Sequence, residues 1–163
     1  MEYYNKVIES VGVRFLKGNN FKIEKPITVL DYSDTENTIL LLHQGSLKFS
    51  EEMELVNEGE ILFIPAGRKT NISFGQQGKK TETNIEGFLD NKRKYLQTIS
   101  FKEIKSVEED CVTILNFEAK VFDVVNFFHS LGIPPFVIRF NDRIATIVED
   151  IIKESEQNTP GKE

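Results

Sequence analysis

Few side chains in this sequence combine a reactive type with the spacing that chemistry requires. The chain contains two histidines, His43 and His129, and one cysteine, Cys111. A transition metal held by protein needs about three His, Cys or carboxylate ligands, and a histidine acting as a general base is oriented by a neighbouring group. We interpret both histidines as structural, with ligand contact by His43 as the alternative. No catalytic residue is predicted, and no enzymatic activity is expected.

The lone cysteine also bears on the compartment. Cys111 has no intrachain partner for a disulfide, and a single free thiol is typical of a reducing environment. The first 30 residues contain no apolar run of signal-peptide or membrane-spanning length. We therefore expect a cytoplasmic protein that does not enter a membrane.

The net charge argues against direct nucleic-acid binding. The 163 residues include 20 Lys and Arg against 26 Asp and Glu, a formal net charge of −6, whereas nucleic-acid-binding domains carry a basic excess. The balance reverses locally, because the basic residues outnumber the acidic ones between residues 79 and 105. These basic residues are Lys79, Lys80, Lys92, Arg93, Lys94, Lys102 and Lys105. We interpret 78–110 as a solvated insertion, with an anion-binding patch as the alternative.

The spacing of apolar runs predicts a mainly β domain. Up to about residue 76, short apolar runs are separated by turn-forming residues at intervals of about a dozen positions, which is typical of a meander or sandwich. Strands are predicted at 38–43, 46–49, 60–64 and 111–117. A short amphipathic helix is predicted at 121–131, before the Gly132-Ile133-Pro134-Pro135 break.

A second amphipathic helix is predicted at 142–156. Apolar residues recur there at i, i+3, i+4, i+7 and i+8, which places them on one helix face. They are Ile144, Ile147, Val148, Ile151 and Ile152. Such a face must be buried, either on the sheet of its own domain or in a subunit interface.

One segment resembles the second signature of the cupin barrels. Gly59 is followed after five residues by Pro65-Ala66-Gly67, and Gly45 resembles the glycine turn that closes the first signature. The resemblance implies a small cupin-type barrel, also called a double-stranded β-helix or jelly-roll. The family's metal ligands are missing, however. By the cupin spacing they would fall at Thr38, at Thr70, and at Tyr32 and Asp34 or Asp31 and Ser33. No metal or other cofactor is therefore expected.

The downstream half is similar to the amino-terminal sensing domain of AraC-type transcription regulators. The similarity lies in a strand ending at Asn116-Phe117, in the phenylalanines at 122, 127 and 128, and in the helix at 142–156. It implies a cupin-like barrel at 1–140 with an insertion near 78–110, and a C-terminal helix at 141–163. This helix would lead to a dimerisation helix and a helix-turn-helix DNA-binding module outside this chain. A homodimer is expected in the full-length protein.

The same resemblance implies an effector site inside the barrel. In this sequence the corresponding positions, with further inward residues from strand alternation, are Thr28, Thr38, Leu40, Leu42, Thr70, Ile72, Val112, Ile114 and Asn116. The set is mostly apolar, so it fits a small apolar or amphipathic effector better than a sugar. An interior packed with side chains is the alternative. Residues 1–10 resemble the arm that folds over the barrel mouth in this family, or form an ordinary terminus.

Two other functions remain open. The spacing of Gly45 and Gly59 also occurs in cyclic-nucleotide-binding barrels, where a Gly-Glu pair opens a short helix and an arginine binds the phosphate. Here Gly59-Glu60 runs into an apolar segment, and Arg68 is the nearby arginine. A metal-free cupin enzyme such as a sugar epimerase would need His43 together with Asp31 or Asp34.

Overall fold

Two β-sheets build the domain. The computed structural model describes residues 11–75, 81–121, 125–126 and 132–139. The first sheet has the order β12 (Phe136–Ile138), β6 (Ile61–Ile64), β3 (Asn37–Gln44), β10 (Cys111–Val121), β1 (Val11–Ile23) and β9 (Leu96–Ile99), with β11 (Val125–Asn126) paired to β10. The second has the order β5 (Glu54–Val56), β4 (Leu47–Phe49), β7 (Thr70–Phe74), β2 (Ile27–Tyr32) and β8 (Thr81–Asn84). The prediction of a mainly β, cupin-like domain is confirmed.

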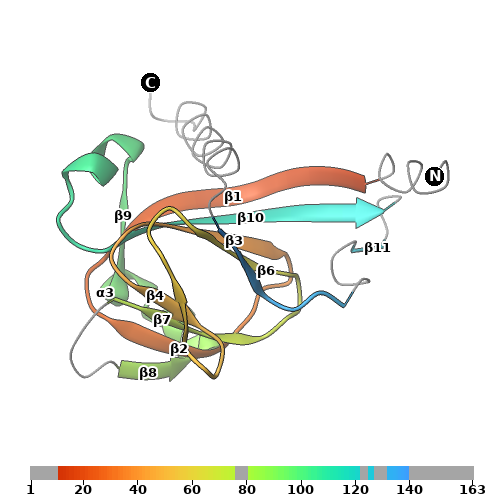
Figure 1. The fold of residues 1–163 in the computed structure, drawn as a ribbon, viewed down its shortest axis with the longest axis horizontal. Helices are drawn as coiled ribbons and strands as arrows, with labels where there is room; N and C mark the ends of the chain where they lie inside the picture. The colour runs from red at the N-terminus through yellow and green to blue at the C-terminus, as the bar shows by residue number, and fades with distance from the viewer. Residues whose placement is uncertain (1–10, 76–80, 122–124, 127–131, 140–163) are drawn as a thin grey trace.

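The sheets form two layers with the core between them (Figure 1). One continuous cluster of buried apolar side chains includes Leu40 and Val112 from the first sheet and Ile72 and Phe74 from the second. Pairing is antiparallel except between β2 and β8. No strand pair among the described residues closes one sheet onto the other. None of the described helices is long and apolar enough to cross a membrane.

The predicted strands at 38–43, 46–49, 60–64 and 111–117 correspond to β3, β4, β6 and β10. All four residues of β6 are buried, because β6 is covered on both faces. Gly45 joins β3 to β4 at a φ of 100°, and a Cβ there would collide with the Asp110 carboxylate. This turn therefore needs glycine.

The segment at 78–110 differs from the predicted solvated insertion. Its strands extend both sheets, because β8 pairs with β2 and β9 pairs with β1. It also includes helices α2 (Ile85–Asp90), α3 (Lys92–Tyr95) and η1 (Phe101–Ser106). Phe88 of α2 is buried and stacks on Phe74 with 6.1 Å between ring centroids. Most of its charged residues are exposed, while Phe88, Tyr95 and Leu96 enter the core.

The predicted helix at 121–131 is wrong where the structure describes it. Val121 ends β10, and Val125–Asn126 form β11, which pairs back on β10. Alternating and helical spacing cannot be separated in so short an apolar run. The rest of that segment, the arm at 1–10, and the predicted helix with its interface residues Ile144, Ile147, Val148, Ile151 and Ile152 lie outside the described residues.

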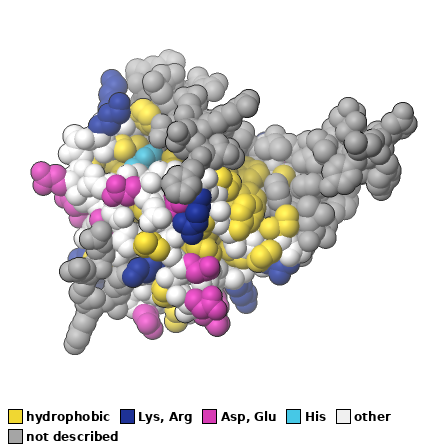
Figure 2. All heavy atoms as spheres, viewed as in Figure 1, with side chains coloured by type: hydrophobic (Ala, Val, Ile, Leu, Met, Phe, Trp, Pro, Cys, Tyr) yellow, Lys and Arg dark blue, Asp and Glu magenta, His cyan; other side chains and the backbone are white. Residues whose placement is uncertain are grey.

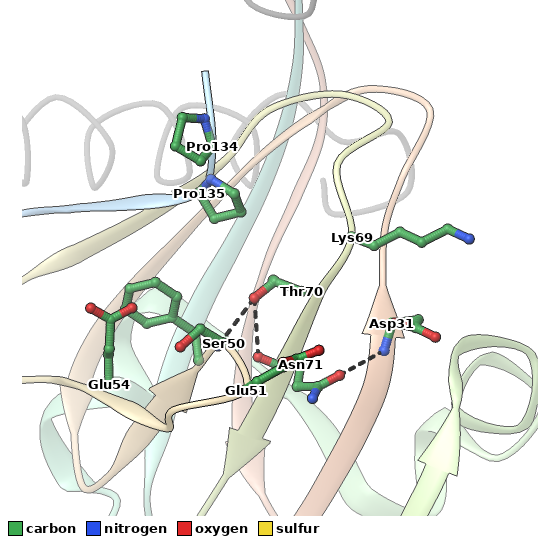
Figure 3. Close-up of a pocket in the computed structure, with 10 residues that line it drawn as sticks. Asp31, Ser50, Glu51, Glu54, Lys69, Thr70, Asn71, Pro134 and Pro135 are labelled. Atoms are coloured by element: carbon green, nitrogen blue, oxygen red, sulfur yellow. Dashed lines mark hydrogen bonds between the residues drawn. The ribbon is translucent and has the colours of Figure 1, made fainter. Parts of the chain in front are cut away.

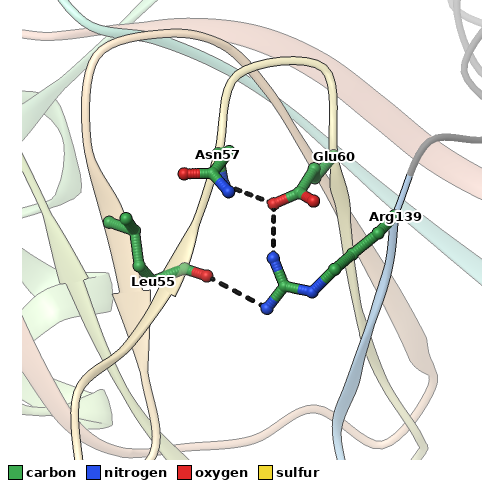
Figure 4. Close-up of polar contacts among 4 residues, drawn as sticks. All are labelled: Leu55, Asn57, Glu60 and Arg139. Atoms are coloured by element: carbon green, nitrogen blue, oxygen red, sulfur yellow. Dashed lines mark hydrogen bonds and ion pairs between the residues drawn. The ribbon is translucent and has the colours of Figure 1, made fainter.

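An ion pair between Arg139 and the buried carboxylate of Glu60 holds the chain just after β12 (Figure 4). The guanidinium of Arg139 donates from Nη1 to Oε1 of Glu60 at 2.7 Å, and its Nη2 donates to the Leu55 carbonyl at 3.4 Å. The same Oε1 accepts the backbone N–H of Asn57 at 2.7 Å. Glu60 is only 3% exposed, so this pair links the β5–β6 turn to the end of β12 inside the protein.

Candidate functional site

All nine predicted ligand-binding residues are buried. They are Thr28, Thr38, Leu40, Leu42, Thr70, Ile72, Val112, Ile114 and Asn116. The five aliphatic members belong to the main core cluster, where they pack with large side chains such as Phe74 and Phe88. The residues of β3 and β10 face the core as predicted, whereas Thr28 lies on the other face of β2 from the core residues Ile27 and Val29. The role of this set in ligand binding stays a prediction.

The polar residues of this interior pair with one another. Asn116 donates from Nδ2 to Thr38 Oγ1 at 2.9 Å and to Asp34 Oδ2 at 3.3 Å. On the other face of the second sheet, away from the core residues Ile72 and Phe74, Thr28 Oγ1 donates to Ser73 Oγ at 3.2 Å. Because these buried polar groups already have hydrogen-bond partners, they do not require a ligand to satisfy them.

Two of the positions at which cupins would carry metal ligands lie opposite each other in the second sheet. Tyr32 of β2 lies opposite Thr70 of β7 in the sheet register. Tyr32 packs into the core against Phe88, with 6.3 Å between ring centroids, and burial raises the pKa of its hydroxyl, with a smaller contribution from Asp34. Among the described residues, no three or more His, Cys, Asp or Glu are placed to hold a metal ion.

A cavity of about 370 Å³ lies at the Thr70 end of the second sheet (Figure 3). Its lining comes from the end of β2, the β4–β5 turn, the start of β7, and the segment before β12. The lining residues are Asp31, Phe49, Ser50, Glu51, Glu54, Lys69, Thr70, Asn71, Pro134 and Pro135. We call this cavity the rim pocket. It includes one of the predicted ligand-binding residues, Thr70.

Hydrogen bonds fix two strained turns of the rim pocket. The backbone N–H of Ser50 donates to Thr70 Oγ1 at 3.1 Å and to the Asn71 carbonyl at 2.9 Å. Asn71 Oδ1 accepts the backbone N–H of Asp31 at 3.0 Å. Asp31 and Ser50 have φ angles of 53° and 70°, which are unfavourable for residues other than glycine. Such strain concentrates where the surrounding structure fixes a binding geometry.

The chemistry of the rim pocket suits binding. Phe49 and the two prolines supply apolar surface, while three carboxylates, one ammonium, one amide and two hydroxyls supply polar contacts. Among the described residues of the lining there is neither His nor Cys to activate Ser50 or Thr70 as a nucleophile. The Pro-x-Gly motif pointed to Thr70, whereas no motif signalled the approach of Pro134 and Pro135, which are more than 60 residues away in the chain.

The structure also bears on the two alternative functions, a cyclic-nucleotide site and a metal-free enzyme. The Gly59-Glu60 pair leads directly into β6, and Glu60 binds Arg139. It does not open a short helix as a cyclic-nucleotide site requires. His43 lies on the outer face of β3, opposite the core-facing Thr38, as alternation predicted, so it does not share the interior with Asp34.

His43 is expected to make stability depend on pH. Burial lowers its pKa below the ordinary value of 6.5, so the unfolded chain takes up a proton more readily than the folded one. The stabilisation is complete above pH 6.5 and is lost as pH falls through the lower folded pKa, by at most about 1.4 kcal/mol per pH unit. Urea unfolding from pH 7.5 to 5 should show the wild type losing stability relative to His43→Gln. A constant or growing advantage of the wild type toward low pH would contradict this.

Comparisons with known proteins give no family assignment. No family model matches the chain, and no curated protein matches it. Two solved structures of ToxT from Vibrio cholerae are similar, each at 9% identity. The apo K231A variant from strain SCE256 covers 89% of this chain with a TM-score of 0.45. The protein from strain O395 covers 91% with a TM-score of 0.47. This chain spans about half the length of those proteins, 47% of each, and similarity at this level assigns no function.

Proposed function

We propose that this chain is the metal-free, ligand-sensing domain of an AraC-type transcription regulator, and that its effector binds in the rim pocket. The observation that carries the proposal is this preformed cavity of about 370 Å³, in which the described residues combine apolar and polar walls. ToxT belongs to the AraC family, but a TM-score below 0.5 adds no support for function. The support from sequence is the set of motifs around Gly45, Gly59 and Asn116-Phe117.

The rim pocket favours a small amphipathic effector with a cationic or donor-rich head. Among the described lining residues, the acidic Asp31, Glu51 and Glu54 outnumber the one cation, Lys69, and all four are exposed. Phe49 is buried and offers an apolar floor. An ammonium or hydroxyl head would bind the carboxylates, while an apolar body would pack on Phe49 and the prolines.

The position of the rim pocket offers a mechanism for signalling. Pro134 and Pro135 stand directly before β12, which pairs with β6 and is followed by Arg139 in its ion pair with Glu60. An effector that contacts the prolines therefore acts on the segment that leads to the C-terminal residues. If it prefers one arrangement of this segment, it shifts the population of the dimer geometry that positions the DNA-binding module.

Ligand binding is tested with two probes that share a carbon skeleton and differ in charge. We expect phenethylamine to raise the unfolding midpoint and phenylacetate to leave it unchanged. A ligand at 100 times its Kd stabilises by about 2.7 kcal/mol. The Glu51→Gln/Glu54→Gln double variant should abolish the shift, whereas Glu52→Gln, a neighbouring exposed residue outside the lining, should retain it. A shift that is equal for both probes, absent for both, or insensitive to the double variant would overturn this site.

The regulator assignment is tested separately. The gene region after the codon for Glu163 should encode two helix-turn-helix units, and the purified 163-residue chain should not bind duplex DNA tightly. A stop codon there, or tight DNA binding by this chain alone, would overturn the assignment while leaving the rim pocket intact as a ligand site.

A further inference from the structure

A second hollow of about 220 Å³ lies on the outer face of the first sheet. Its lining comes from the end of β3 and from the facing side of η1, and consists of His43, Gln44, Phe101, Ile104 and Lys105. We call it the His43 pocket. The rim pocket and the core both lie on the other side of β3, and neither the sequence motifs nor the proposed function uses these residues together.

The fold holds the walls of the His43 pocket in place. A capping box fixes the start of η1, in which Ser100 Oγ accepts the N–H of Glu103 and Glu103 Oε1 accepts the N–H of Ser100. Gln44 donates from Nε2 to the backbone carbonyls of Glu108 and Glu109, which tie the segment after η1 to β3. The site is therefore built before any ligand arrives.

Hydrogen bonds determine which nitrogen of His43 is available. The hydroxyl of Thr113 donates to Asn20 Oδ1, so its oxygen must accept from His43. His43 Nε2 lies 2.6 Å from that oxygen and therefore carries the proton. Nδ1 then has a lone pair, and it has no hydrogen-bond partner among the described residues. Burial lowers the pKa of His43, which favours this neutral form.

The other side chains of the His43 pocket add a positive charge and apolar surface beside His43 Nδ1. Lys105 forms no ion pair with any described residue, so its ammonium is available to an anion. Phe101 and Ile104 supply apolar walls three residues apart on η1. His43 is half-buried, and Figure 2 shows part of a histidine side chain at the surface near apolar side chains.

We propose that the His43 pocket binds a small single-ring carboxylic acid that also carries a hydroxyl or N–H donor. The carboxylate pairs with the Lys105 ammonium, the donor binds His43 Nδ1, and the ring packs between Phe101 and Ile104. The volume of about 220 Å³ lies below the range of cavities for drug-sized ligands and therefore suits one ring. This site is independent of the rim pocket in position and opposite to it in ligand charge.

Titration calorimetry with 4-hydroxybenzoate on the full 163-residue chain tests the proposal. We expect a Kd of about 1 mM or tighter. Benzoate, which lacks the donor, should bind roughly 3- to 10-fold more weakly, and 4-hydroxybenzamide, which lacks the charge, should bind more weakly again. Lys105→Gln should weaken 4-hydroxybenzoate binding about 10-fold. Lys102→Gln, an exposed residue of the same helix outside the lining, should not change it.

A second readout locates the bound molecule. In imidazole NMR spectra, 4-hydroxybenzoate should shift the Nδ1 resonance of His43, and the Glu51→Gln/Glu54→Gln variant should show the same shift. No binding at 10 mM, equal binding by Lys105→Gln and wild type, or loss of the shift in the Glu51→Gln/Glu54→Gln variant would overturn the proposal. None of these outcomes would affect the amine test of the rim pocket.

Discussion

Replacing Phe88 by alanine should lower the free energy of unfolding by roughly 3–5 kcal/mol, the usual range for truncating a buried phenylalanine. Phe88 is 1% exposed, stacks on Phe74, and contacts Tyr32 edge-on with 6.3 Å between ring centroids. It comes from α2 and reaches the core between residues of the second sheet. Alanine would leave a cavity that these large rings cannot close. Urea unfolding followed by circular dichroism measures the loss.

The neighbouring residue provides the control. Leu89 is the next residue of the same helix and is 58% exposed, so Leu89→Ala should change stability by no more than about 0.5 kcal/mol. Equal, small effects of both substitutions would mean that 78–110 is a solvated insertion, as its charge suggested. A large effect of Phe88→Ala alone would show that this segment is part of the core.

The sequence predicted the strands of the central fold because their residues keep the spacing of a half-buried sheet. The segment at 60–64 is almost wholly apolar, and the glycines at 45 and 59 mark turns with positive φ. The segment at 78–110 was misread because its burial depends on single residues such as Phe88 and Tyr95. Glu86 and Asp90 stand two positions from Phe88, and Lys94 precedes Tyr95, so no extended periodic apolar pattern marks either residue.

The candidate site was only partly predictable for a different reason. Strand alternation correctly placed Thr38, Leu40 and Leu42 on the core-facing side of β3, but alternation does not tell whether the space between two sheets is hollow. Side-chain volume decides that, and large rings from the second sheet and from α2 occupy the core. The rim pocket depends instead on the left-handed turns at Asp31 and Ser50 and on Pro134 and Pro135, which approach from a distant part of the chain.

Replacing Arg139 by methionine should destabilise the protein by roughly 2–4 kcal/mol, between the values for exposed and for fully buried ion pairs. The Arg139 side chain is 45% exposed, but its partner Glu60 is almost completely buried. Glu60 Oε2 already has no hydrogen-bond partner among the described residues. Without Arg139, the carboxylate would keep only the N–H of Asn57. A buried charge without a counterion is costly, and this cost exceeds the direct attraction of the pair.

A double-mutant cycle separates this effect from lost packing. In the Glu60→Gln background, where the buried charge is gone, Arg139→Met should cost clearly less than in the wild type. The exposed pair of Arg14 and Glu118, joined at 3.0 Å, supplies the control, because Arg14→Met should change stability by less than about 1 kcal/mol. If Arg139→Met costs as little as Arg14→Met, the pair does not hold the end of β12. If the loss persists in the Glu60→Gln background, the arginine acts through packing of its side chain. A loss confined to the wild-type background would establish that a buried charge anchors the segment linking the rim pocket to the C-terminal residues.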